Sequence, residues 1–379
     1  MSKDYAENAL KLHKTLKGKI SLSLKDTLDT QDKLSTHYTP GVGAVSSFIA
    51  KHPKLARDYT WLNNNVAVIS DGSAVLGLGD IGPLASLPVM EGKAMLFKHF
   101  ANIDAIPIVL DVHTPDEIVS SIKAIAPSFG GINLEDIAAP KCFEVEDRLK
   151  AELGIPVFHD DQHGTAIVVL AGLINAMKIT GKKLSNCKIV VVGAGAAGTA
   201  IIKLLYLYAS PTIFAVDSKG IISKNRVDLN PEKIKLLKYT NKNNFSGSLE
   251  DALNDADIFI GVSKAGLLTS ELVKNMAKNP IIFAMANPVP EIMPEDAKRA
   301  GASIVATGRS DFPNQVNNAL AFPGIFRGAL DNKVNLITDV HKINVAKTIA
   351  SLVNKPTLDE IIPSVLNPKL VTSIAKVII

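Results

Sequence analysis

One glycine-rich turn constrains the fold of this chain more than any other segment. The sequence Gly-Ala-Gly-Ala-Ala-Gly occupies residues 193–198, directly after the apolar run 187–192 and before a helical pattern that reaches about Tyr208. Asp217 ends the next apolar run, about 20 residues further on,. Glycines here allow a tight turn and close approach of the backbone to a pyrophosphate, which the helix N-terminus then faces. The pattern therefore predicts a dinucleotide-binding unit of the Rossmann type.

The expected cofactor contacts lie in this turn and at the end of the following strand. Asp217 would accept hydrogen bonds from the adenosine ribose and would disfavour a 2′-phosphate,. Ser218 and Lys219 come next and could receive such a phosphate, so we expect NAD, with NADP as the alternative,. A turn that only connects strand to helix is the competing interpretation. The residues assigned to the cofactor are Gly193, Gly195, Ala196, Ala197, Gly198, Asp217 and Asn287.

Short apolar runs alternate with stretches of helical spacing along most of the chain,. This alternation predicts an α/β fold with largely parallel sheets. We expect two domains. Residues 1–163 would form an N-terminal α/β domain for substrate and metal, and residues 164–379 a Rossmann-like, doubly wound parallel sheet with a helical C-terminal tail,. Within them we expect a polar helical stretch over residues 1 to about 35 and an apolar helix at 165–179.

Composition and charge argue against several other classes of protein. The net charge is +4 over 379 residues and aromatic residues make up 5%, so we expect no nucleic-acid partner,. The N-terminus lacks the apolar core of a signal peptide, and no apolar run reaches the roughly 18 residues that span a bilayer,. Two cysteines are too few for a disulfide framework and fit a reducing compartment,. We therefore expect a cytoplasmic protein with no membrane partner.

Two pairs of adjacent carboxylates follow predicted strands in the first half of the chain. Glu135 and Asp136 follow one strand, and Asp160 and Asp161 follow the next. Adjacent carboxylates suit a regular helix face poorly, whereas a backbone that bends at a strand end lets both converge. Three or four such oxygens suit a hard divalent cation, Mg²⁺ or Mn²⁺. Solvated surface acids or helix caps are the competing interpretation.

Lys93 and a pair of histidines add further candidate chemistry. An isolated lysine is usually a surface charge, but burial beside a metal would lower the pKa of Lys93 and make it a usable general base,. His159 and His163 are four residues apart, as in zinc hydrolases that carry H-E-x-x-H on a helix, although here Asp replaces Glu,. A zinc hydrolase is therefore a second hypothesis.

Several longer motifs together resemble those of malic enzymes of the short bacterial and archaeal type. The similarity extends from Tyr38 to about Pro363. Larger eukaryotic members have Arg where this chain has Ala74, so the charge of the substrate would be met elsewhere. The matching motifs lie at residues 38–43 (Tyr-Thr-Pro-Gly-Val-Gly), 70–82, 87–94, 131–137, 158–166 (Phe-His-Asp-Asp-Gln-His-Gly-Thr-Ala), 286–291 and 317–324.

The resemblance implies oxidative decarboxylation of L-malate to pyruvate and CO₂, with reduction of NAD(P)⁺ and a divalent metal. Lys93 would remove the proton of the C2 hydroxyl, and Tyr38 would protonate C3 of the enol. Asp160 would orient Lys93 or couple to its charge. The remaining implied roles are those of the metal ligands Glu135, Asp136 and Asp161 and of the substrate-binding residues Asn287 and Asn318.

Other functions stay open on the sequence. A malolactic reaction would convert malate to lactate without net accumulation of NADH. The zinc hydrolase and a catalytically inactive dinucleotide-binding regulator belong to different classes. The resemblance, together with 47% hydrophobic residues, also implies a homodimer.

Overall fold

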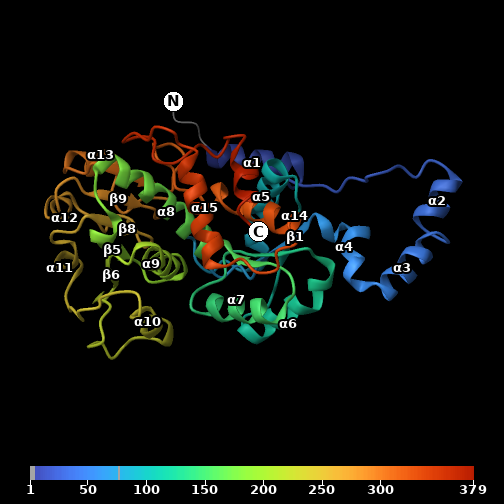
Figure 1. Cartoon of the computed structure of the whole chain (residues 1–379), viewed down its shortest axis with the longest axis horizontal. Helices are drawn as coiled ribbons and strands as arrows, with labels where there is room; N and C mark the ends of the chain where they lie inside the picture. Colours follow the sequence, from blue (N-terminus) through green and yellow to red (C-terminus); the bar gives the residue numbers. More distant parts are fainter. Residues whose placement is uncertain (1–4, 76) are drawn as a thin grey trace.

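The computed structural model describes residues 5–75 and 77–379 (Figure 1). The first of its two sheets holds four parallel strands in the order β2-β1-β3-β4. Because the strands are parallel, their carboxyl ends meet at one edge of the sheet, where the residues that follow β3 and β4 come together. The strands are β1 (Asn65–Ser70), β2 (Asp104–Val109), β3 (Ile132–Leu134) and β4 (Val157–His159).

The second sheet has six strands in the order β10-β9-β8-β5-β6-β7. All neighbours are parallel except β6 and β7. The strand order reverses at β5, between β6 and β8, and the glycine turn follows this strand, as in doubly wound nucleotide-binding sheets. The strands are β5 (Lys188–Val192), β6 (Thr212–Asp217), β7 (Gly220–Ile221), β8 (Ile258–Gly261), β9 (Ile281–Ala284) and β10 (Ile304–Thr307). The expected α/β class is confirmed.

Helices cover both faces of each sheet, which explains why the strands are apolar on both sides. Val66 and Val68 of β1 enter one core, and Ala67 and Ile69 enter the other, because successive side chains of a strand point to opposite faces,. The helices around the first sheet are α5 (Pro83–Ala101), α6 (Pro115–Ile125) and α7 (Lys141–Glu152). Those of the second sheet are α9 (Ala196–Ala209), α10 (Pro231–Leu236), α11 (Leu249–Leu253), α12 (Ser270–Lys274) and α13 (Pro294–Arg299).

One long helix, α8 (Asp160–Thr180), connects the two sheets. It packs on α9 and contributes to a core that is shared by both sheets. By length and composition α8 could cross a membrane, but 67% of its most apolar window is buried inside the protein, as in a core helix. The helix begins five residues before the expected position at residue 165. Asp160 and Asp161 therefore lie in its first turn rather than in a bent strand end, where carboxylates are favoured by the helix dipole,.

The C-terminal helices pack against helices of both halves of the chain. They are α14 (Phe322–Asp331), α15 (Asp339–Ser351) and α16 (Leu370–Ala375). Phe322 and Phe326 of α14 pack edge-on against Phe97 of α5, with ring centroids 4.7 and 5.3 Å apart. The tail is thus helical in part, as expected, and it ties the two halves of the chain together.

The N-terminal segment differs from the continuous helical stretch that was expected, because residues 17–30 form no helix. None of its helices, α1 (Tyr5–Leu16), α2 (Gln31–His37), α3 (Val42–Lys51) and α4 (Ala56–Tyr59), contains a buried residue. In Figure 1, α2 and α3 extend to one side, away from the sheets. We call residues 20–51 the arm. Several of its apolar side chains are exposed, among them Leu22, Leu24, Leu28, Leu34, Val42 and Val45.

Candidate active site

A cleft of about 830 Å³ lies where the carboxyl ends of both sheets face each other. One wall carries Lys93 of α5 and the acidic residues after β3. The opposite wall carries the glycine turn after β5, so a dinucleotide on the turn would face the charged wall,. Nine residues singled out from the sequence line this cleft: Lys93, Glu135, Asp136, Asp161, Gly195, Ala196, Ala197, Asn287 and Asn318.

Lys93 is buried between two carboxylates. Its Nζ lies 2.5 Å from Asp160 Oδ2 and 2.7 Å from Glu135 Oε1, and 4.3 Å from the centre of the Phe322 ring. Burial alone would lower the pKa of Lys93, but the charges of Asp160 and Glu135 outweigh it and raise this pKa above its ordinary value,. With both carboxylates facing it, Lys93 therefore holds its proton firmly, opposite to the lowering that was expected beside a metal.

Three carboxylates form a compact cluster next to Lys93. Glu135, Asp136 and Asp161 offer oxygen atoms that all lie within 4.8 Å of one another. The backbone N–H of Asp136, at φ 53°, donates to Asp161 Oδ2 at 2.7 Å. Burial and the neighbouring carboxylates raise the pKa of Glu135 well above its usual range, although Lys93 opposes them. Crowded, buried oxygens of this kind fit a hard divalent cation, which would relieve their repulsion.

Asp160 is fully buried at the start of α8, and its Oδ2 accepts a hydrogen bond from the Nζ of Lys93. Among the described residues no hydrogen-bond donor reaches its second oxygen, Oδ1. A Cβ on Gly164 would lie 2.0 Å from that oxygen, so only glycine fits one turn later in the helix. Gly164 was not predicted from the sequence, although a glycine four residues after an aspartate at the start of an apolar helix is a recognisable signal.

The two histidines do not converge on a common point. His159 caps α8, with Nε2 3.3 Å from Asp161 Oδ2 and Nδ1 2.9 Å from Gln162 Nε2. His163 lies inside the helix and its Nε2 is 2.8 Å from Glu146 Oε2. Each ring is thus engaged by a different carboxylate. In the described part of the chain, the three-carboxylate cluster contains neither histidine. The geometry therefore argues against the zinc hydrolase.

The glycine turn has the close approaches that its sequence implies. A Cβ on Gly198 would lie 1.7 Å from the carbonyl oxygen of Gly193, which itself adopts φ 107°. The first and third glycines are therefore required by the backbone, while Gly195 has open space and lines the cleft. Asn287 also lines it, and its carbonyl oxygen lies 2.7 Å from where a Cβ on Gly77 would be.

Asp217 ends β6 as expected, but its carboxylate is already paired. Arg226 donates to both of its oxygens at 2.7 and 3.1 Å, and Lys233 donates to Oδ2 at 2.6 Å. Burial would raise the pKa of Asp217, yet the hydrogen bonds from Arg226 and Lys233 outweigh it and lower this pKa. Ser218 and Lys219 were the residues expected to receive a 2′-phosphate. Arg226 and Lys233 were not predicted, because the segment after β7 that carries them folds back onto Asp217.

Tyr38 is the one predicted catalytic residue that lies far from the cleft. It caps the C-terminus of α2 in the arm and is 67% exposed. It is not among the described residues that line the cleft. Within one chain, the structure brings Lys93 and the carboxylates together but does not bring Tyr38 to them.

These features define a class: a two-domain enzyme with a Rossmann-type dinucleotide fold, whose cofactor turn faces a lysine and a carboxylate cluster. Two family models match the chain, the malic enzyme N-terminal domain over residues 17–150 and the malic enzyme NAD-binding domain over residues 162–378. The chain belongs to the malic enzyme family.

Characterised relatives agree over nearly the whole length. The bifunctional malic/malolactic enzyme of Bacillus subtilis is 55% identical over 375 residues, which cover 98% of this chain and 92% of the relative. The NAD-dependent malic enzyme of Geobacillus stearothermophilus is 55% identical over 96% of this chain and 76% of its own length. The crystal structure of the NAD-dependent malic enzyme from Thermotoga maritima superimposes with a TM-score of 0.95 at 50% identity, covering 98% of both chains.

Proposed function

We propose that this protein catalyses the oxidative decarboxylation of L-malate, in which malate and NAD(P)⁺ give pyruvate, CO₂ and NAD(P)H. The observation that carries the proposal is the position of Lys93. It lies between Glu135 and Asp160 in the same cleft as the cofactor turn. The proposed base, the acidic cluster and the turn proposed to bind the hydride-accepting cofactor thus line one cleft.

Lys93 is the proposed general base. A hydride leaves C2 of malate for the nicotinamide while Lys93, as the neutral amine, takes the proton of the C2 hydroxyl, which yields a β-keto acid. Asp160 is a positioning residue in this scheme, because its buried carboxylate accepts a hydrogen bond from Lys93 and fixes the direction of the lysine side chain,. Asn287 and Asn318 line the cleft and are proposed to bind oxygens of the substrate.

Glu135, Asp136 and Asp161 are the proposed ligands of Mg²⁺ or Mn²⁺. The fit rests on their shared site and on the buried repulsion that raises the pKa of Glu135,. When bound, a divalent ion supplies Lewis-acid stabilisation for the enolate that decarboxylation leaves behind. With a cation held by Glu135, the carboxylate charge that faces Lys93 would be offset, and the neutral form of the lysine would be favoured.

The enolate must then be protonated on C3, and Tyr38 is the proposed acid. Since Tyr38 lies in the exposed arm, we propose that the arm of one copy reaches the cleft of a second copy in a homodimer. The exposed apolar side chains of the arm support this, because a surface of that kind is typical of an interface,.

The function is tested by initial rates with malate, Mn²⁺ and either NAD⁺ or NADP⁺. We expect reduced nicotinamide to accumulate in proportion to pyruvate, with NAD⁺ preferred because of the Asp217 carboxylate. Absence of reduced cofactor with both dinucleotides would contradict the proposal. Lactate without net NADH would instead indicate the malolactic reaction, which the name of the Bacillus subtilis relative includes.

A further inference from the structure

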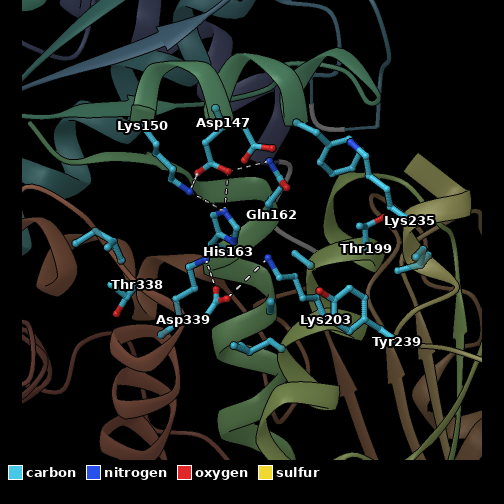
Figure 2. A pocket seen from close by; sticks show the side chains of 18 of the residues that line it. Asp147, Lys150, Gln162, His163, Thr199, Lys203, Lys235, Tyr239, Thr338 and Asp339 are labelled. Atoms are coloured by element: carbon cyan, nitrogen blue, oxygen red, sulfur yellow. Dashed lines mark hydrogen bonds and ion pairs between the residues drawn. The ribbon is translucent and has the colours of Figure 1, made fainter. Parts of the chain in front are cut away.

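A second cavity lies behind the first turn of α8 and shares no lining residue with the cleft. Its volume is about 460 Å³, and α7, α8, α9, α10 and the start of α15 enclose it. Figure 2 shows Lys150 and His163 on one side, with Lys203 and Asp339 opposite. We call this space the rear cavity. The proposed function assigns no role to it.

Five lysines line the rear cavity: Lys150, Lys203, Lys235, Lys238 and Lys342. Four carboxylates accompany them. His163 adds no charge, because burial, together with nearby Lys342, lowers its pKa to about 3. The wall therefore carries a small excess of positive charge at neutral pH.

Three of the four carboxylates of the rear cavity, those of Glu146, Glu232 and Asp339, are already paired, and Glu232 holds Lys235 at 2.7 Å. Glu146 is engaged on both oxygens: Oε1 by Lys150 at 2.7 Å and the backbone N–H of His159 at 2.9 Å, and Oε2 by the ring of His163. The Oδ1 of Asp339 accepts a hydrogen bond from the Nζ of Lys342 at 2.9 Å, and its Oδ2 lies 3.8 Å from the Nζ of Lys203. The cavity thus offers few spare hydrogen-bond acceptors to a ligand.

Hydrogen-bond donors, in contrast, are in surplus. Each ammonium group carries three N–H donors. Lys342 is only 5% exposed and donates one hydrogen bond, to Asp339. Burial, reinforced by the nearby charge of Lys150, lowers the pKa of Lys342, so its charge is incompletely balanced. A ligand rich in acceptors would satisfy the free donors and relieve the repulsion between the lysines.

Part of the remaining wall is apolar, although Gln162, Thr199 and Thr338 also line it. Phe143, Leu204, Leu236 and Ile337 line it beside the lysines. A volume of this size is at the lower end of the range for small-molecule sites, which is about 300–1,000 Å³. The wall therefore fits a small organic molecule that carries one anionic group and an apolar part.

Two hydrogen bonds and one ion pair connect the rear cavity to the acidic cluster. Glu146 binds the backbone of His159 and the ring of His163, on either side of the start of α8. The Nε2 of His159 in turn lies 3.3 Å from Asp161 Oδ2. A displacement of Glu146 by a ligand that competes for Lys150 would therefore act on a residue of the proposed metal site.

We propose that the rear cavity binds a small organic anion through a phosphate or carboxylate group, and that this ligand changes the affinity of the cleft for divalent metal through Glu146 and the first turn of α8. This site goes beyond malate oxidation and does not use the catalytic residues.

Calorimetric titration of the full chain with phenyl phosphate and with benzoate tests the binding and distinguishes the two anionic groups. We expect at least one probe to bind the wild type, and to bind Lys203→Gln and Lys342→Met at least about tenfold more weakly. Lys203 is half-exposed, so its replacement spares the fold. Lys347→Gln is the control on α15, since Lys347 lies outside the cavity, and it should bind as the wild type does. No binding of either probe at millimolar concentration, or equal binding by Lys203→Gln, would overturn the site.

The coupling is tested by counting bound Mn²⁺ with electron paramagnetic resonance, with and without the binding probe. We expect the dissociation constant for Mn²⁺ to change at least about twofold in the wild type and not in Lys203→Gln. Unchanged Mn²⁺ affinity despite bound probe would overturn the coupling. Neither measurement needs turnover, so a failure of malate oxidation would not be mistaken for a failure here.

Discussion

The protonation and the orientation of the Lys93 side chain depend on the groups that surround it. It contacts two carboxylates and an aromatic ring in a buried position. We expect Lys93→Ala to reduce malate oxidation by about 10²–10⁴-fold, as for removal of a general base. NADH binding, followed by fluorescence, should persist, because the glycine turn is on the opposite wall. Turnover near the wild-type rate would refute the assignment of the base.

Gly164 gives a second prediction, since a methyl group there would collide with Asp160 Oδ1. In Gly164→Ala the carboxylate must move and Lys93 loses its alignment, so we expect kcat to fall about tenfold or more while the chain stays folded. Gly154→Ala is a matched control, because a Cβ on Gly154 would meet open space. Equal kcat values in both variants would show that Asp160 does not position Lys93.

Cofactor choice depends on Asp217 and its two cations. In Asp217→Ser the repulsion of a 2′-phosphate is removed. Lys233 and the Nη1 of Arg226 lose their carboxylate partner and can bind the phosphate, while Asp228 still holds the other side of Arg226. We expect the ratio of kcat/KM for NADP⁺ to that for NAD⁺ to rise about tenfold or more. Asp228→Ser also loosens Arg226 but keeps the Asp217 carboxylate, so it should change the ratio much less. A similar rise in both variants would mean that Asp217 does not control the preference.

At the scale of elements, α7 and α8 are joined by the buried carboxylate of Glu146. Burial would raise the pKa of Glu146, but the charge of Lys150 and the hydrogen bond with the His163 ring outweigh it and hold this pKa well below its ordinary value of 4.5. A lowered folded-state pKa stabilises the fold above the ordinary pKa, and that stabilisation is lost as the pH falls through the folded-state value.

We therefore expect Glu146→Gln to lower the free energy of unfolding by about 3 kcal/mol near neutral pH, as measured by urea denaturation. The difference from the wild type should shrink when the pH is lowered below 4.5. Glu144→Gln on the same helix removes a mostly exposed carboxylate and should have a small effect. A pH-independent deficit in Glu146→Gln would contradict this account.

The elements that could be predicted from the sequence are those with local signatures. The turn at 193–198 is one, because its first and third glycines each make a close contact with the backbone. The acidic residues after β3 are another, since parallel topology brings strand ends together. The start of α8 was misplaced because Asp160 and Asp161 are polar. Only the burial of Asp160 against Lys93 and the place of Asp161 in the carboxylate cluster explain them. Arg226 and the rear cavity depend on contacts between distant segments, which leave no periodic pattern.

At the scale of the whole molecule, the arm is the part that a single copy leaves unexplained. If Tyr38 serves the cleft of a partner, the inactive variants Tyr38→Phe and Lys93→Ala should complement each other after mixing and refolding together. Half of the dimers would then be mixed, and each would hold one intact site, which predicts about one quarter of wild-type activity. If Tyr38 served its own chain, no site would contain both residues, and the mixture would stay inactive.

The long helix α8 also has a consequence for protein engineering. Its first turn contains Asp160 and Asp161, and its remaining length packs against the core of the cofactor half. A chimera joined at residue 163 would graft these acids onto a helix from another enzyme. A junction after Gly181, where the helix ends in a left-handed residue, would transfer α8 whole. Exchange of cofactor halves between relatives should therefore succeed more often at that glycine than at the earlier junction.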